Sequence, residues 1–176
     1  MDLNPIKPLL LHDGTKLLVR PLGPADHDRL AEGFHKLSIE SRYRRFFTSK
    51  QTLSEREVDF FTDCDDVQHL ALGAFLADRD SDLVAVARCV REAADPTVAE
   101  VAIVVADEWQ RQGVGKAVLH ELATRALKAG IHQFRALLLE ENHAMRRVLE
   151  YIGERQQVTH SGEGTMEILV RLSRRD

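Results

Sequence analysis

The sequence predicts an α/β protein with a central mixed β-sheet of about seven strands and helices on both faces. Three observations support this fold class. Apolar, β-prone runs alternate with amphipathic segments, a strand–helix–strand unit lies in the second half, and no proline-, glycine- or serine-rich linker divides the chain. Because 176 residues is a common size for one domain, we expect an N-terminal extension at residues 1–15 and a single domain at residues 16–176.

Serine residues mark helix starts in the first half of the chain. Ser54 and Glu57 form a capping box, in which each side chain can bind the backbone amide of the other residue. Ser38 can cap an earlier helix, and Pro24 favours the start of another. We therefore expect a strand at residues 16–21 and helices at residues 24–37, at residues 38–47 and from residue 54 onward.

The second half of the chain predicts a β-hairpin followed by a crossover unit. Two β-prone runs flank a polar turn at residues 78–82, which indicates antiparallel strands. The clearest helical pattern lies at residues 113–129. Apolar residues fall at i, i+3, i+4 and i+7 from Leu119, and the helix should end near Gly130. The strands on either side of this helix should be parallel, with a right-handed connection. We expect strands at residues 69–77, 83–91, 98–106 and 133–139, helices at residues 113–129 and 142–151, and two last strands around a turn at residues 161–164.

Composition and spacing argue against several classes of function. The 24 basic and 28 acidic residues give a net charge of −4, without the basic surplus typical of nucleic-acid binding. The eight histidines and two cysteines show no metal-ligand spacing. The apolar run at residues 9–11 is too short for a signal peptide or a membrane span. We expect a cytoplasmic protein without metal, nucleic-acid or membrane partners, and its oligomeric state stays open.

A turn with two glycines, between the strand at residues 98–106 and the helix that follows, is the best candidate binding site. Glycines at positions 113 and 115 let the backbone approach a ligand closely and adopt positive φ. The new helix presents unpaired N–H groups and the positive end of its dipole, which suit a pyrophosphate. The alternative is a turn that only connects a strand to a helix, since the third glycine of a dinucleotide fingerprint is missing. The candidate residues are Gln110, Arg111, Gln112, Gly113, Val114, Gly115 and Lys116.

The segment VADEWQRQGVG at residues 105–115 resembles the acetyl-CoA signature of the GNAT acetyltransferases, a strand followed by Gln/Arg-x-x-Gly-x-Gly/Ala. The resemblance extends over roughly residues 16–172 and implies the GNAT fold, with acetyl-CoA as cosubstrate and an amine as acceptor. It also implies that the strand splays from its neighbour. Backbone groups around Ile103, Val104 and Val105 would then pair with the pantetheine arm, and the amides of the turn would hold the pyrophosphate. Asn142 matches a position that often contacts the cofactor, and it is equally suited to be a helix cap.

A closer resemblance, to bacterial protein lysine acetyltransferases of the Pat type, rests on three segments. They are LSIESRYRRFF at residues 37–47, AEVA at residues 99–102 and ENHAM at residues 141–145. This resemblance implies direct acetyl transfer, in a ternary complex, to a protein lysine side chain, for example on acyl-CoA synthetases. Two alternatives remain: an acetyltransferase for a small-molecule amine, and a non-catalytic CoA-binding regulatory protein.

Glu100 is the candidate general base for such a transfer. A free lysine has a pKa near 10.4, so deprotonating it at pH 7 costs about 4–5 kcal/mol. Glu100 shares one strand face with Ala102 and Val104, and a carboxylate there is costly to bury unless it is paired or faces a cleft. One interpretation pairs it with an arginine of the neighbouring strand, such as Arg88. The Pat-type resemblance favours the other, because it places the catalytic glutamate at this position.

The sequence departs from the family pattern at the general acid. Many GNAT proteins have a tyrosine seven residues after the asparagine, whereas this chain has Leu149 there and Tyr151 two residues further on. Because a thiol of pKa near 8.5 leaves without much help, a tyrosine acid is not required. We therefore do not assign this role to Tyr151.

Overall fold

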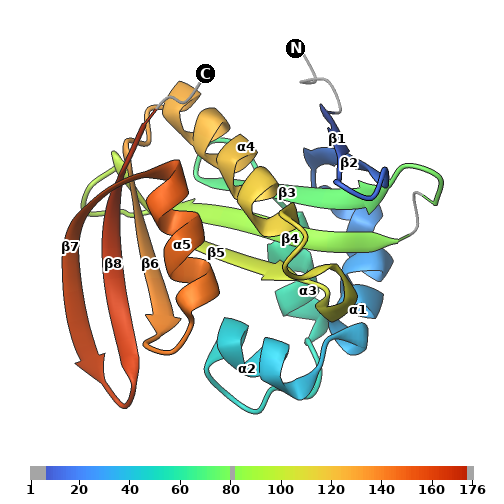
Figure 1. The fold of residues 1–176 in the computed structure, drawn as a ribbon, viewed down its shortest axis with the longest axis horizontal. Helices are drawn as coiled ribbons and strands as arrows, with labels where there is room; N and C mark the ends of the chain where they lie inside the picture. The colour runs from blue at the N-terminus through green and yellow to red at the C-terminus, as the bar shows by residue number, and fades with distance from the viewer. Residues whose placement is uncertain (1–6, 80–81, 174–176) are drawn as a thin grey trace.

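The computed structural model describes residues 7–79 and 82–173, which fold around one eight-stranded sheet (Figure 1). The order of strands across the sheet is β1-β2-β3-β4-β5-β6-β8-β7. The strands are β1 (Lys7–Leu10), β2 (Lys16–Pro21), β3 (His69–Leu76), β4 (Leu83–Arg91), β5 (Val98–Val105), β6 (Gln133–Leu139), β7 (Gly153–Gly162) and β8 (Thr165–Leu172). The helices are α1 (His27–Lys36), α2 (Ile39–Phe46), α3 (Glu55–Thr62), α4 (Val114–Lys128) and α5 (His143–Ile152), with 3₁₀ turns η1 (Pro24–Asp26) and η2 (Asp107–Trp109).

Helices cover both faces of the sheet, as the sequence predicts. In Figure 1, α4 and α5 lie in front of the strands, and α1 and α3 lie behind them. Residues of β3 show why both layers form. Leu72 belongs to the core that includes α4, whereas Phe75 belongs to a second core with Leu30 of α1 and Val58 of α3. Because alternate residues of a strand point to opposite faces, a strand buried on both sides has a continuous apolar sequence.

Each predicted helix and strand is present. The pair β3 and β4 is antiparallel, and β5 and β6 are parallel on either side of α4. Residues 80 and 81 of the predicted polar turn lie outside the described residues. None of the helices in the described part of the chain has the length and apolar character needed to span a membrane.

One strand was not predicted. Strand β1 pairs antiparallel with β2 at the edge of the sheet, inside the region expected to be an N-terminal extension. It raises the number of strands from the expected seven or so to eight. Pro8 lies in β1, and proline is tolerated in edge strands because its missing N–H need not serve a second neighbour. Residues 1–6 of the expected extension lie outside the described residues.

Strands β5 and β6 stay together for only a short distance. Their parallel pairing covers three residue pairs and ends at Glu100 and Arg135. Strand β5 continues to Val105 alongside β4, while β6 continues to Leu139 alongside β8. Figure 1 shows the result: β2 to β5 run across the view, and β6 to β8 run steeply away from them. The sheet therefore opens just after Glu100.

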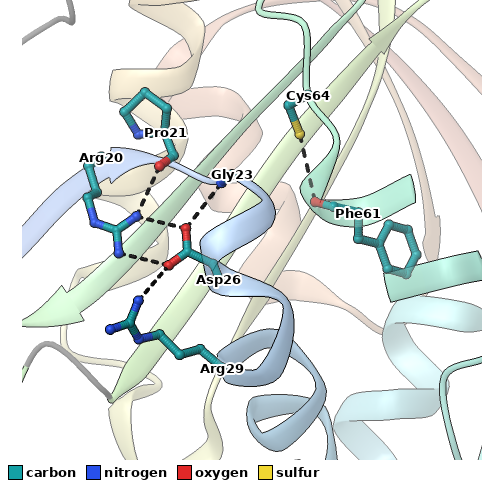
Figure 2. A network of polar contacts seen from close by, with 7 residues as sticks. All are labelled: Arg20, Pro21, Gly23, Asp26, Arg29, Phe61 and Cys64. Atoms are coloured by element: carbon teal, nitrogen blue, oxygen red, sulfur yellow. Dashed lines mark hydrogen bonds and ion pairs between the residues drawn. The ribbon is translucent and has the colours of Figure 1, made fainter. Parts of the chain in front are cut away.

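A buried carboxylate, Asp26, joins the end of β2 to the first helices (Figure 2). Asp26 is 1% exposed and accepts two hydrogen bonds of 2.8 Å from the guanidinium of Arg20. Arg29 and the amide of Gly23 each donate one more, at 3.1 Å. Burial raises the pKa of this carboxyl, but the hydrogen bonds from Arg20 and Gly23 outweigh burial and hold the pKa below its ordinary value. The ionised carboxylate thus fixes α1 against β2.

Replacing Asp26 with alanine should lower the free energy of unfolding by about 3 kcal/mol, because it breaks a buried ion pair. Urea unfolding followed by circular dichroism measures this loss. The pKa of Asp26 in the folded protein lies below its ordinary value of 3.8. Its contribution to the free energy of unfolding is therefore complete above pH 3.8 and is lost as the pH falls through the folded-state pKa. The difference between the two proteins should therefore shrink in acid. Asp28→Ala, at an exposed site two residues away in α1, should change stability by no more than about 0.5 kcal/mol. An equal loss in both variants would contradict the role of Asp26.

Candidate functional site

A cleft of about 1250 Å³ lies where β5 and β6 diverge, bounded by α2, by the turn between β5 and α4, and by α5. The residues that line it come from distant parts of the chain. Ten of the twelve residues predicted from the sequence line it: Glu100, Ile103, Val104, Val105, Gln110, Arg111, Gly113, Gly115, Lys116 and Asn142.

The backbone of β5 presents unpaired groups to this cleft. The amide of Ala106 donates to Val84, and Val98 accepts from Glu92, so the even-numbered residues of β5 pair with β4. The odd-numbered residues therefore direct their N–H and C=O groups toward β6. Beyond the divergence, Ile103 has no strand partner on that side among the described residues, and of the Val101 backbone only the carbonyl is left over, since its amide belongs to the last pair with β6.

We expected the backbone of residues 103–105 to be free for a ligand, and two details of β5 differ from that expectation. The carbonyl of Val105 accepts a hydrogen bond of 3.0 Å from the side chain of Gln110, so the turn already occupies it. Val104 is an even-numbered residue, so its backbone pairs with Val86 of β4, and it reaches the cleft through its side chain. Val101 also lines the cleft and was missed by the sequence reasoning, although its odd position on a splayed strand leaves its carbonyl without a strand partner in the described part of the chain.

Within the described part of the chain, the N-terminus of α4 lacks the side-chain cap that α2, α3 and α5 have. Side chains of Ser38, Ser54 and Asn142 cap α2, α3 and α5. No side chain of the described residues caps α4, which begins after Gly113 and is the longest of these helices. The first amides of a helix lack partners within it, and the end that they form carries partial positive charge. The start of α4 therefore offers backbone donors to an anion in the cleft.

Left-handed backbone turns the chain from β5 into α4. Arg111 has φ of 60° and Gly113 has φ of 84°. This conformation is costly for a residue with a side chain, and it recurs at functional sites and in anion-binding concavities. A Cβ atom added to Gly113 would meet no atom within 4 Å, so open space lies above this glycine.

Two of the predicted residues do not line the cleft. Val114 is 0% exposed and its side chain packs in the core, so only its amide could serve a ligand. Gln112 donates to the carbonyl of Glu108 at 2.8 Å and lines a separate cavity of about 340 Å³ beside β1. Lys116 lines both cavities, and its ammonium lies 3.7 Å from the ring centroid of Tyr151.

In α5, the position at which many GNAT proteins have a tyrosine is buried in this chain. Leu149 is 1% exposed and belongs to the core, so no polar group occupies that position. Tyr151 lines the cleft and contacts Lys116. Asn142 combines the two roles considered for it: it lines the cleft, and its side chain accepts from the amide of Met145 at 3.1 Å. A contact between Asn142 and a cofactor stays a prediction.

A carboxylate that the sequence reasoning missed, Asp107, ties α2 to the turn before α4. Asp107 accepts hydrogen bonds from the hydroxyl of Ser38 at 2.6 Å and from the hydroxyl of Ser41 at 2.8 Å. Gln110 in turn donates to Ser41 at 3.0 Å. Burial raises the pKa of Asp107, but the hydrogen bonds from Ser38 outweigh it and the pKa is lowered. These residues lie 66 to 69 positions apart in the chain, so no local pattern reveals the network.

Glu100 is exposed and lines the cleft at the point where β5 and β6 part. Arg88, the alternative partner, is buried elsewhere and donates to the carbonyl of Phe61 and to the ring of His69, both at 3.1 Å. No ion pair between Glu100 and another described residue is present. The pairing with Arg88 is therefore not formed, and the carboxylate is free to contact a molecule in the cleft.

The described residues contain no group of three or more side chains suited to hold a metal ion. The chemistry that this arrangement can support combines a free carboxylate, unpaired strand amides and an uncapped helix N-terminus.

Comparisons with known proteins agree with this geometry. The model of a family described as the acetyltransferase (GNAT) family matches residues 36–153. An acetyltransferase Pat of Mycolicibacterium smegmatis is 31% identical in an alignment 153 residues long, which covers 83% of this chain and 43% of that protein. The chain thus spans less than half the length of this curated relative.

Two solved structures show the same fold. The GNAT domain of S. lividans PAT superimposes with a TM-score of 0.84 at 30% identity, over 95% of this chain and 97% of that one. A cAMP-binding acyltransferase from Mycobacterium smegmatis gives a TM-score of 0.65 at 27% identity, over 97% of this chain and 48% of that one.

Replacing Gly113 with alanine should weaken acetyl-CoA binding about tenfold or more, because the new methyl group enters the space in front of the α4 amides. Isothermal titration calorimetry measures the Kd. Gly130→Ala is a matched control: Gly130 has φ of 83° near the other end of α4, also with no atom within 4 Å of an added Cβ. Both variants should lose about 1 kcal/mol of stability, since both force alanine into the left-handed region. Equal affinities in the two variants would rule out a ligand at Gly113.

Proposed function

The chain belongs to the GNAT acetyltransferase family, and from that premise we propose that it transfers the acetyl group of acetyl-CoA to a lysine side chain of a protein. The observation that carries the proposal is the position of Glu100. It is a free, exposed carboxylate where β5 and β6 diverge, in the same cleft as the uncapped N-terminus of α4.

The cleft offers a separate set of groups for each part of acetyl-CoA. The carbonyl of Val101 and the backbone groups of Ile103, which have no strand partner on this side among the described residues, suit the amides of the pantetheine arm. The amides that open α4, with the side chains of Arg111 and Lys116, suit the pyrophosphate. The thioester would then lie toward Glu100, at the point from which the two strands separate.

The proposed chemistry is a direct transfer. The acceptor ammonium gives a proton to Glu100, directly or through water, and the freed lone pair of nitrogen attacks the thioester carbon. The C–N bond forms and the C–S bond breaks, with its electron pair leaving on sulfur as the thiolate. The nitrogen releases its second proton to the thiolate or to solvent. A strand amide, such as that of Ile103, can stabilise the negative charge that develops on the carbonyl oxygen.

Two observations support a protein acceptor. Glu100 is exposed, so a lysine on the surface of a folded protein can reach it without entering a closed pocket. The segments at residues 37–47, 99–102 and 141–145 that resemble Pat-type enzymes all contribute residues to the cleft, including Arg44, Ala102 and Met145. The similarity to proteins named Pat points the same way.

Glu100→Gln should lower kcat at pH 7 about 100-fold and leave the Kd of acetyl-CoA unchanged, because it removes a proton acceptor and no cofactor contact. Stopped assays with a lysine peptide, run from pH 6 to pH 10, measure the effect. The rate of the variant should keep rising toward the acceptor pKa near 10.4, since solvent must then deprotonate the amine.

Glu167→Gln is the matched control for that experiment. Glu167 is a carboxylate of β8, on the same sheet face as Arg135, with which it forms an ion pair of 2.8 Å. The substitution Glu167→Gln should leave the rate of acetyl transfer and its pH profile unchanged. Full activity of Glu100→Gln at pH 7 would remove Glu100 from the mechanism.

The acceptor is identified by labelling cell lysates and purified acyl-CoA synthetases with radioactive acetyl-CoA, followed by mass spectrometry of modified lysines. We expect a few proteins to be labelled by the wild type and none by Glu100→Gln. Turnover with a panel of small amines, without labelled protein, would instead indicate a small-molecule acetyltransferase. Tight acetyl-CoA binding without turnover on any acceptor would indicate a non-catalytic CoA-binding protein.

A further inference from the structure

A third and smaller cavity adjoins the side of the cleft formed by α2, with which it shares Arg45 and Val104. It has a volume of about 60 Å³ and lies between β4, β5 and the layer of α1, α2 and α3. Its walls are apolar, with Phe34, Phe61 and Val86 among them, except for the guanidinium groups of Arg45 and Arg88. Arg45 also lines the large cleft, next to Glu100. This small cavity is therefore adjacent to the proposed site of chemistry.

Arg45 is a cation that has aromatic neighbours but no polar partner. Its guanidinium carbon lies 4.8 Å from the ring centroid of Phe46 and 5.9 Å from that of Phe61. No residue in the described part of the chain hydrogen-bonds or ion-pairs with it. Burial lowers the pKa of Arg45, and the charge of Glu100 opposes that effect. The N–H donors of Arg45 thus have no acceptor within the described part of the chain, and the residue lines both the small cavity and the cleft.

Arg88 adds a second positive charge on the same side of the sheet. Its guanidinium carbon lies 4.2 Å from the ring centroid of Phe61, and the residue is 5% exposed. Burial and the nearby charge of Arg45 lower the pKa of Arg88 to about 9, which still leaves it protonated at neutral pH. Two guanidinium groups therefore repel each other in a poorly solvated place, where an anion would be stabilised by both.

The other polar groups beside Arg88 supply no anion. A guanidinium can only donate, so the Nε2 atom of His69 accepts its hydrogen bond and the ring is neutral. Burial and Arg88 lower the pKa of His69 to about 4, which agrees with that assignment. Burial raises the pKa of the Cys64 thiol to about 11, and this thiol contacts the carbonyl of Phe61 at 3.7 Å (Figure 2). Glu100 is the carboxylate whose charge acts on Arg45, and the proposed reaction uses Glu100 as a base.

We propose that this cavity binds a carboxylate carried by the acceptor, so that Arg45 selects lysines with an acidic side chain nearby in the acceptor protein. The inference rests on the proposed function, because it assigns a substrate class to the same acceptor site. A carboxylate can accept two parallel hydrogen bonds from the planar guanidinium of Arg45. The apolar walls suit the methylene groups that precede the carboxylate, and the small volume limits the occupant to the end of a side chain.

The test compares matched lysine peptides, in which one glutamate or one glutamine is moved through the positions flanking the lysine. Both kcat/KM and binding to the CoA-loaded protein, by fluorescence anisotropy, are measured. The wild type should favour the best glutamate peptide about tenfold or more over its glutamine match, as one charge-assisted hydrogen bond allows. Arg45→Gln should accept both peptides equally. Arg45→Lys, which keeps the charge but loses the planar fork, should retain part of the preference.

Arg79→Gln is the matched control, since Arg79 is an exposed arginine of the loop after β3. It should keep the full preference, and unchanged acetyl-CoA affinity shows that each variant is folded. Amino acids with free and with amidated carboxyl groups form a second arm. A preference for the free acid that depends on Arg45 would place the carboxylate on a small acceptor.

The proposal fails if the wild type shows no preference in rate or in binding, or if Arg45→Gln keeps it. These results differ from failure of the proposed function, in which no lysine is acetylated at all. In that case binding to the CoA-loaded protein still decides whether Arg45 recognises a carboxylate.

Discussion

The divergence of β5 from β6 is the constraint on which the site depends. The backbone donors and acceptors of a strand inside a sheet normally form hydrogen bonds with two neighbouring strands. Leaving these groups unpaired in a buried place costs free energy. Here the parallel pairing with β6 stops after Glu100, and from Ile103 onward β5 has a strand neighbour only in β4 among the described strands. The unsatisfied groups must face water or a ligand, so the same break that weakens the sheet creates a place for an extended, amide-bearing molecule.

The elements around this opening are held by polar contacts across long stretches of chain. Asp107 binds Ser38 and Ser41 of the α2 region, and Gln110 binds both Ser41 and the carbonyl of Val105. These bonds connect the side of the cleft formed by α2 to the turn that leads into α4. Because the carboxylate of Asp107 has a lowered pKa, the network keeps its charge-assisted bonds throughout the neutral range. A ligand at the turn and an acceptor beside α2 would therefore meet one preorganised frame rather than two independent loops.

Most of the fold could be predicted from the sequence because its signals are local. Capping serines, the apolar periodicity of α4 and the paired glycines act within a few residues of the structures that they specify. Strand β1 was missed because it is short, contains Pro8 and owes its existence to pairing with β2. Ten of the twelve candidate site residues line the cleft because a strand–turn–helix motif fixes their relative positions. The network of Asp107 and the place of Arg45 between two cavities depend on contacts far apart in the chain, which no local pattern records.

The alternation of β5 explains how one strand can serve both substrates. Its odd-numbered residues turn their backbone groups toward the opening and their side chains into the core with α4, as Ile103 and Val105 show. Its even-numbered residues bond to β4 and turn their side chains to the opposite face, where Glu100 and Val104 lie on the side of α2. Backbone and side chain thus point in directions set by the same two-residue period. A slip of one residue against β4 would move the carboxylate into the apolar core and turn the free amides away from the cleft at the same time. The register of β4 and β5, which is fixed by apolar packing on both faces, would therefore place the proposed base beside the proposed cosubstrate site.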